Sequence, residues 1–431
     1  MDTDREKADG RARSIFRYSN FAISVTVTLA PPPAPARTAP FAPWPVFDDE
    51  MQSAVAAVLT SGKVNQWTGG EVKAFEAEYA EAVGVRHAIA LMNGSVAIEL
   101  ALIALGVGPG DEVVVTPRSF MASVSSVVLV GATPVFADVD PDSGNLTAET
   151  VAAVLTERTR AVIPVHLAGW PVEMDPLMAL ARDRGFYVIE DCAQAHGATL
   201  DGRPVGSMGH VGCFSFCQDK IITTGGEGGL LTTDDTDIFK RAWAFKDHGK
   251  GYDTVFHTEH PPGFRWLHDG FGTNWRMTEM QAALGRVALR RLPEWTRQRR
   301  ANASALREHL ARHDTFHVPE PRAGAVHAEY KTYWAVRPER LAAGWSRDRI
   351  VEAAAALGAP LFSGSCSEIY LEKAFDGTGW RPEGGLPVAR ELGETSLMTL
   401  VHPTLSEADL HDVGRAVDAV MAEASAAAPS L

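Results

Sequence analysis

An aspartate and a lysine in the middle of the chain have the types and spacing of a paired chemical site. Asp191 ends an apolar run, and Lys220 follows 29 residues later, after a second apolar run and before a glycine-rich turn. An aspartate can keep the ring nitrogen of a pyridine-type cofactor protonated, which lets the ring accept electrons. A lysine amine can bond to an aldehyde and then move a proton. Taken singly, the two residues could equally be a helix cap and a surface cation.

The surrounding elements should bring these two residues together. Short apolar runs alternate with helical patterns, which predicts a mostly parallel sheet with helices on both faces. The expected strands are 87–91, 112–116, 133–137, 161–165, 187–190, 211–216 and 229–232. The expected helices are near 96–105, 121–130, 148–155 and 173–183. In an open α/β sheet, ligands bind beyond the carboxyl ends of the strands, so Asp191 and Lys220 should face one site.

The pattern divides the chain into three parts. Residues 1–45 end in a Pro/Ala-rich stretch and are expected to form a disordered leader. We expect a large α/β domain over 46–295 and a smaller α+β domain over 296–431. A helical run over 277–292 meets Pro293, which should kink or restart it. Beyond it we expect helices over 297–312, 347–357 and 407–424 and a strand over 333–336.

Composition limits the class of protein. The formal charge of −14 argues against a general nucleic-acid binder, because phosphate backbones attract basic patches. No apolar run reaches the ~20 residues of a membrane helix. A short run near residue 25 loosely resembles a signal peptide, but acidic residues crowd the start of the chain. The four cysteines are too few for a disulfide scaffold and lack metal-ligand spacing, so we expect no metal and a cytoplasmic location.

The residues around Asp191 and Lys220 resemble the DegT/DnrJ/StrS sugar aminotransferases, a branch of the fold-type I pyridoxal-phosphate enzymes. The family pattern is D-x-A-Q-(A/S)-H-G-A, then F-S-F-x-x-x-K and a glycine-rich turn. This chain has DCAQAHGA from Asp191, FSFCQDK ending at Lys220, and TTGGEGG shortly after it. The resemblance extends from about residue 47 to the C-terminus. It implies a large domain with a mostly parallel sheet, a smaller C-terminal α+β domain, and pyridoxal 5'-phosphate as cofactor.

The resemblance assigns cofactor contacts residue by residue. Lys220 matches the lysine that bonds to the cofactor, and Asp191 matches the partner of its ring nitrogen. Gln194 matches the residue that hydrogen-bonds its phenolic oxygen. The other implied contacts are Gly94, Ser95 and Ser215 at the phosphate, Phe120 stacked on the ring, and Asn274 reaching across a dimer. The phosphate turn also has a physical basis, because N–H groups at a helix start attract anions. A plain helix cap and a core aromatic remain the alternatives for the turn and for Phe120.

The substrate side is less defined. Arg276 is a candidate for the carboxylate of the amino donor, because a guanidinium pairs bidentately with a carboxylate. A structural ion pair is the alternative for this arginine. The resemblance also places four residues in the substrate pocket, namely Trp67, Arg118, His166 and Tyr330. His196 is expected to pack structurally.

The resemblance implies a transaminase that moves an amino group from glutamate or glutamine to a ketosugar, usually nucleotide-linked. It also implies a homodimer with shared active sites. Lys220 argues against the dehydratase branch of the family, which has histidine at that position. Three alternatives stay open: a cyclitol ketone or sugar phosphate as acceptor, an aromatic amino acid precursor as product, and a regulatory or binding protein on the same scaffold. The intact Lys220, Asp191 and Gln194 favour an enzyme over the last of these.

Overall fold

The computed structural model describes residue 37 and residues 39–425. Most of the predicted leader, residues 1–45, therefore lies outside the described residues. Its last part is described and packs on the fold, where the Trp44 indole N–H donates to the carbonyl oxygen of Lys220 at 2.9 Å. Residues 39–45 thus differ from the predicted disordered leader, because an aromatic side chain with a hydrogen-bonded N–H holds them on the folded chain.

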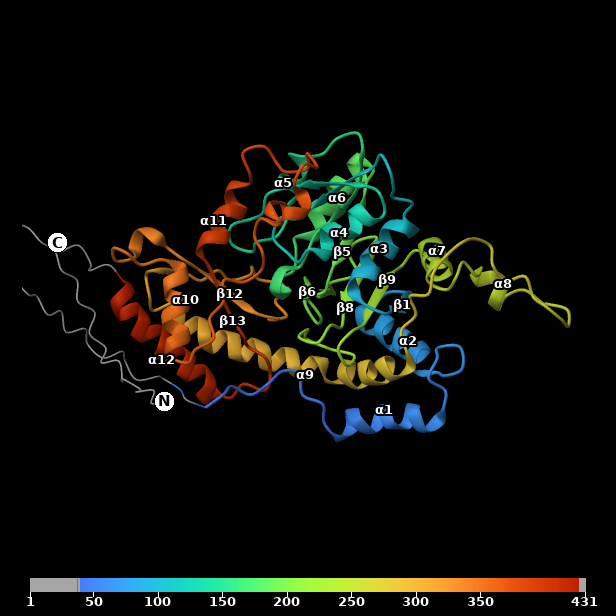
Figure 1. Ribbon diagram of the computed structural model, residues 1–431, viewed down its shortest axis with the longest axis horizontal. Helices are drawn as coiled ribbons and strands as arrows, with labels where there is room; N and C mark the ends of the chain where they lie inside the picture. The colour runs from blue at the N-terminus through green and yellow to red at the C-terminus, as the bar shows by residue number, and fades with distance from the viewer. Residues whose placement is uncertain (1–36, 38, 426–431) are drawn as a thin grey trace, which may run out of the picture.

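A seven-stranded sheet forms the centre of the larger part of the described chain (Figure 1). Its strands are β1 (His87–Leu91), β2 (Glu112–Val115), β3 (Thr133–Phe136), β4 (Thr159–Ile163), β5 (Tyr187–Asp191), β8 (Val211–Ser215) and β9 (Gly229–Thr233). The strand order is β1-β9-β8-β5-β4-β2-β3. Strands β8, β5, β4, β2 and β3 run parallel, whereas β9 is antiparallel to both β1 and β8. The predicted mostly parallel sheet is therefore confirmed.

Helices cover both faces of this sheet. They are α1 (Asp49–Ser61), α2 (Glu71–Val83), α3 (Gly94–Ala104), α4 (Ala122–Leu129), α5 (Ala148–Ala152), α6 (Met174–Arg184), α7 (Thr236–Lys246), α8 (Tyr252–Phe256) and α9 (Glu279–Leu310). Alternate strand residues point to opposite faces. Accordingly, Ile89 belongs to a buried cluster with side chains of α3, α4 and α7, whereas Ala90 belongs to a cluster with α2, α6 and α9. Burial on both faces explains why the strands read as continuous apolar runs.

The C-terminal part has a sheet and a core of its own. Its strands are β10 (Phe316–His317), β12 (Thr332–Val336) and β13 (Ser396–Thr399), and its helices are α10 (Arg347–Ala356), α11 (Pro387–Thr395) and α12 (Glu407–Ala424). A third buried cluster joins Leu306 of α9, Trp334 of β12 and Val417 of α12. Strand β11 (Ala325–Val326) reaches back to pair with β6 (Thr199–Leu200), which also pairs with β7 (Arg203–Pro204). None of the described helices is both long and apolar enough to cross a membrane.

The helix α9 runs beneath both parts of the fold (Figure 1). It begins with a capping box in which Thr278 and Gln281 each bond the other's backbone N–H. The predicted restart at Pro293 is wrong, because Pro293 lies inside one helix from Glu279 to Leu310. Proline removes one backbone N–H, but the helix packs into the core of the large sheet before Pro293 and into the C-terminal core after it. The domain boundary expected between residues 295 and 296 falls within this shared helix.

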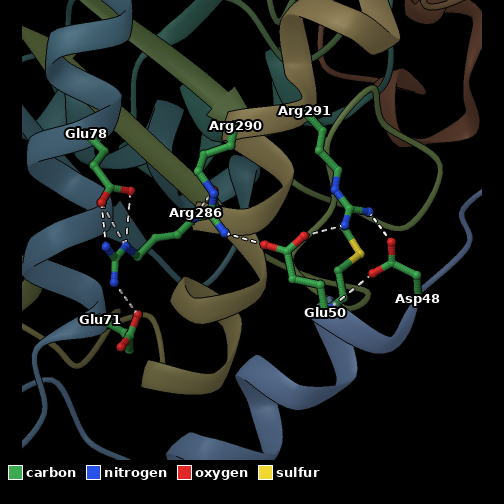
Figure 2. A network of polar contacts seen from close by, with 8 residues as sticks. Asp48, Glu50, Glu71, Glu78, Arg286, Arg290 and Arg291 are labelled. Carbon is green, nitrogen blue, oxygen red and sulfur yellow. Dashed lines mark hydrogen bonds and ion pairs between the residues drawn. The ribbon is translucent and has the colours of Figure 1, made fainter.

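An ion-pair network fastens α1 and α2 to the same helix (Figure 2). Arg286 of α9 binds Glu71 at 2.7 Å and Glu78 at 2.6 Å, both on α2. The neighbouring arginines of α9 point toward α1, where Arg290 binds Glu50 at 2.7 Å and Arg291 binds Glu50 and the helix-capping Asp48. Exposed pairs each contribute little to stability, so the network orients α1 on α9 more than it stabilises the fold.

Candidate active site

A cavity of about 830 Å³ opens at the carboxyl edge of the large sheet. Eight of the residues singled out by the sequence line it: Gly94, Ser95, Phe120, Asp191, Gln194, Ser215, Lys220 and Tyr330. Strands β1, β2, β5 and β8 all end at this edge, so the segments that follow them converge there. Asp191 and Lys220 therefore face one site, as predicted.

Asp191 is the last residue of β5 and is buried at the cavity wall. Its carboxylate accepts a hydrogen bond from the Ser123 hydroxyl at 2.8 Å and another from the backbone N–H of Ala193 at 3.1 Å. Burial raises the pKa of Asp191 above its ordinary value, although the two hydrogen bonds and the charge of Lys220 act against that rise. Both carboxylate oxygens thus have a donor, and a positive charge in the cavity would further favour the ionised form.

Lys220 lies in the loop after β8, beside the polar side chains of Tyr330 and Asp219. Its Nζ atom lies 3.4 Å from the Tyr330 hydroxyl and 3.8 Å from the Asp219 carboxylate. The Tyr330 hydroxyl donates a hydrogen bond to Asp219, which also lies 3.7 Å from the amine of Lys331. Burial acts to raise the pKa of Asp219, but the Lys220 charge and the Tyr330 hydrogen bond leave that pKa below its ordinary value. The cavity thus holds an ionised carboxylate beside the lysine amine.

The N-terminus of α3 forms another wall of the cavity. The side chain of Asn93 caps this helix by accepting from the Val96 N–H at 3.0 Å. The first N–H groups of a helix have no acceptor within it, and the helix dipole adds positive potential there. A side chain at Gly94 is excluded, because its Cβ would lie 2.6 Å from the Cβ of Ser215. This close approach of α3 to β8 gives the cavity an end suited to an anion.

Gln194 lines the cavity, and His196 is buried next to Ser215 of the cavity wall. Gln194 accepts at its Oε1 atom from the backbone N–H of Ala168 at 2.7 Å, which fixes the orientation of its amide. His196 is buried between the Tyr79 hydroxyl at 2.7 Å and the carbonyl oxygen of Ser215 at 2.8 Å. Burial lowers the pKa of His196 to about 3, so this imidazole is neutral. Its packing agrees with the structural role predicted for it.

Three residues assigned to the substrate pocket lie elsewhere in the described chain. His166 is buried and contacts Glu190 at 3.0 Å and the Val172 N–H at 2.9 Å. Arg118 is buried, and its guanidinium donates to the hydroxyls of Ser367 at 2.7 Å and Ser396 at 2.8 Å. Trp67 is partly exposed beside Lys250, whose amine lies 4.2 Å from the ring centroid. Of the four expected pocket residues, Tyr330 alone lines the cavity, because the first three are engaged by protein groups outside it.

Arg276 and Asn274 also lie outside the cavity of their own chain. Arg276 binds the buried carboxylate of Asp247 at 2.8 Å, which is the structural ion pair considered as its alternative. Asn274 is exposed and pairs as an isolated bridge with Asp247. Neither Arg276 nor Asn274 therefore lines the cavity of its own chain.

The sequence reasoning missed two residues that contact the predicted pair and a third that contacts one of them. Ser123 donates to Asp191, Asp219 accompanies Lys220, and Lys331 approaches Asp219. Asp219 is adjacent to Lys220 in sequence and could have been found there. Lys331 likewise follows the predicted Tyr330. Ser123 has no comparable signal, because it reaches Asp191 only through the placement of α4.

Fold and cavity together define an α/β enzyme of the aminotransferase class, with a lysine and a buried aspartate at the carboxyl edge of a mostly parallel sheet. The chain belongs to the DegT/DnrJ/EryC1/StrS aminotransferase family, whose model matches residues 45–418. The predicted family resemblance is therefore confirmed.

Known relatives agree with this assignment. The X-ray structure of the aminotransferase from Psychrobacter cryohalolentis is 56% identical, with a TM-score of 0.88, and the match covers 89% of this chain and 99% of that one. GDP-perosamine synthase from Caulobacter vibrioides is 38% identical over 80% of this chain and 89% of its own length. The dTDP-3-amino-3,4,6-trideoxy-alpha-D-glucose transaminase from Streptomyces venezuelae is 34% identical over 83% of this chain and 88% of its own length.

Proposed function

We propose that this aminotransferase uses pyridoxal 5'-phosphate to move an amino group from glutamate or glutamine to a nucleotide-linked ketosugar. The main support is the single cavity that contains Lys220, Asp191 and Gln194 together with the N-terminus of α3. Relatives named for GDP-linked and dTDP-linked amino sugars favour this acceptor class. Cytoplasmic location, inferred from the cysteine usage of the sequence, is part of the same proposal.

The residues around the cavity fit the proposed cofactor at both of its ends. Asp191 offers a buried carboxylate to a protonated ring nitrogen, and the exposed ring of Phe120 lines the same cavity. Gly94, Ser95 and Ser215 would hold the phosphate, because helix N–H groups and a hydroxyl meet at that end. Gln194 would contact the phenolic oxygen. A cofactor bound in this way supplies an electron sink for the carbon that gains or loses the amino group.

Lys220 performs the proton transfers in this proposal. Its amine would hold the aldehyde of the cofactor, and it would be the base that moves a proton at the substrate carbon. Asp219 and Tyr330 keep this amine in the cavity through contacts of 3.8 and 3.4 Å. Burial raises the pKa of Tyr330, so its hydroxyl stays protonated and acts as a fixed donor to Asp219.

A second copy of the chain completes the site in this proposal. Asn274 is exposed on its own chain and would reach the phosphate in the cavity of a partner copy. Asn274 belongs to the loop between α8 and α9, which also carries large exposed aromatic side chains, with Phe264 79%, Trp266 83% and Phe271 100% exposed. Exposed apolar surface of this kind marks interaction sites. A homodimer with shared active sites would bury these residues.

The first experiment is an absorption spectrum of the purified protein before and after glutamate or glutamine is added, with Lys220→Ala beside it. We expect a yellow protein whose visible band fades with the donor, because the donor's nitrogen is transferred to the cofactor. The variant should lack the normal band and the response to donor. A protein that stays colourless after pyridoxal phosphate is added would overturn the enzyme proposal in favour of the regulatory alternative.

The acceptor is then identified by the second half-reaction. The aminated protein is mixed in parallel with a nucleotide-linked ketosugar, a cyclitol ketone, a sugar phosphate and an aromatic keto precursor. Return of the visible band with the nucleotide-linked sugar is the expected outcome. Return only with one of the other three would replace the acceptor class while leaving the aminotransferase assignment intact.

A further inference from the structure

The segment before α1 contacts the loop after β8 that carries Lys220. Its Trp44 indole N–H donates to the backbone carbonyl oxygen of Lys220 at 2.9 Å, across 176 positions of sequence. The family model begins its match at residue 45, so Trp44 stands just before the matched region. A residue outside that match therefore contacts the backbone of the proposed catalytic lysine.

Trp44 is held firmly enough to act as an anchor. Its ring meets Trp295 of α9 edge to face at 5.1 Å and stacks on His402 at 6.2 Å between centroids. The buried guanidinium of Arg299 lies 4.9 Å from the Trp44 ring centroid. Next to Trp44, the carbonyl oxygen of Pro43 accepts from the Thr404 hydroxyl at 2.9 Å. These contacts fasten the segment to both α9 and the C-terminal part.

Apart from the Trp44 hydrogen bond, one backbone hydrogen bond and two buried neighbours hold the backbone at Lys220 in the described residues. Its N–H donates to the carbonyl oxygen of Cys217 at 3.1 Å, and Ile221 and Ile222 are buried after it. Within the described residues, the Trp44 indole is the donor found for the Lys220 carbonyl. A lysine side chain is long and flexible, so the range of its amine depends on how well its backbone is held.

We propose that Trp44 is a positioning residue for Lys220, so that the segment before the family match is a working part of the active site. The inference rests on the proposed function of Lys220. As the proposed base, the amine of Lys220 would have to lie in one place relative to the substrate carbon, and misplacement of a reacting group lowers the rate steeply. The indole N–H limits the movement of the loop at the residue that carries this amine.

The test compares Trp44→Phe with Trp295→Phe. The first removes the N–H but keeps an aromatic ring, and the second makes the same change in the adjacent ring, which does not bond Lys220. Hydrogen exchange of the backbone amides of residues 217–224 is measured in cofactor-free protein. We expect the exchange rate to rise roughly threefold to tenfold in Trp44→Phe, which corresponds to the net free energy of one hydrogen bond. The rate should stay unchanged in Trp295→Phe. Thr404→Val, which loosens the segment but keeps the indole, should give a smaller rise.

In protein supplied with pyridoxal phosphate, Trp44→Phe should lower the rate of the donor half-reaction by a similar factor, while the KM for the donor changes little. Equal exchange in Trp44→Phe and the wild type, or equal rises in Trp44→Phe and Trp295→Phe, would overturn the inference. Because the exchange measurement needs neither cofactor nor substrate, its result is separate from failure of the proposed function. Faster exchange in a protein without transaminase activity would keep the anchor and reject only its catalytic purpose.

Discussion

Ser123, near the start of helix α4, points its hydroxyl at the carboxylate of Asp191. It donates to Asp191 at 2.8 Å and lies 3.1 Å from the hydroxyl of Ser119. Burial raises the pKa of Asp191, and the Ser123 hydrogen bond is the first of the effects that oppose this rise. Ser123 therefore helps to keep Asp191 ionised, and an ionised Asp191 would favour the protonated form of the cofactor's ring nitrogen.

Ser123→Ala should shift the pH dependence of the reaction. Without the hydroxyl the pKa of Asp191 rises further, so the carboxylate becomes protonated at a higher pH than in the wild type. The acid limb of the kcat/KM profile should move to higher pH. At pH values on this limb, kcat/KM should be about tenfold lower than in the wild type, which corresponds to the free energy of one hydrogen bond to a charged group. Activity should recover as the pH is raised.

The matched control is Ser125→Ala, a change of the same size two residues further along α4. A steady-state pH profile of both variants decides the matter. If the two profiles coincide, or if the loss in Ser123→Ala is the same at every pH, Ser123 has a packing role and does not tune Asp191.

At the scale of elements, the close contact between α2 and α9 depends on a residue without a side chain. A Cβ at Gly285 of α9 would lie 2.7 Å from the ring of Phe75 on α2, which is fully buried. Gly285→Ala should therefore destabilise the protein by about 1–3 kcal/mol, the usual cost of overpacking a core. Chemical denaturation followed by fluorescence would measure the free energy of unfolding.

Gly70→Ala is the control for this prediction, because nothing lies within 4 Å of the added Cβ. It should change the unfolding free energy far less than Gly285→Ala. Equal stability of Gly285→Ala and the wild type would mean that α2 and α9 can separate slightly without cost. The ion pairs of Arg286 with Glu71 and Glu78 would then tolerate that shift (Figure 2).

At the scale of the whole molecule, the proposed dimer predicts complementation between two defective chains. Lys220→Ala removes the reacting amine, and Asn274→Ala removes the contact proposed to act in the partner's cavity. If Asn274 works in trans, a hybrid dimer has both defects in one cavity and an intact second cavity. Equal mixing should then restore about one quarter of wild-type activity, because half of the dimers are hybrids and each has one intact site of two.

Refolding the two variants together and assaying the mixture would test this prediction, with each variant refolded alone as control. Activity no higher than the average of the separate variants would contradict an Asn274 contribution in trans. Sedimentation of the wild type would check the oligomeric state independently. A monomer at assay concentration would reject the shared site.

Local patterns in the amino-acid sequence were enough to predict the large sheet and the position of Asp191 and Lys220 at one of its edges. Strand β1 and helix α12 have the residue limits predicted from periodicity, and the other strands of the sheet differ from prediction by up to two residues. Apolar runs and caps are local signals, so they can be recognised without the fold. Asp191 and Lys220 were recognisable because each ends or follows a strand, and the carboxyl ends of parallel strands meet at one edge.

Which of the remaining candidates reach that edge depends on how the elements are arranged in space. His166 and Arg118 have plausible residue types near strand ends, but Glu190, Ser367 and Ser396 bind them outside the cavity. Ser123 and Trp44 reach the site through long-range packing that leaves no pattern in the local sequence. The physical reason is that a side chain's partner is set by the relative placement of elements, whereas periodicity reports only which face of one element is buried.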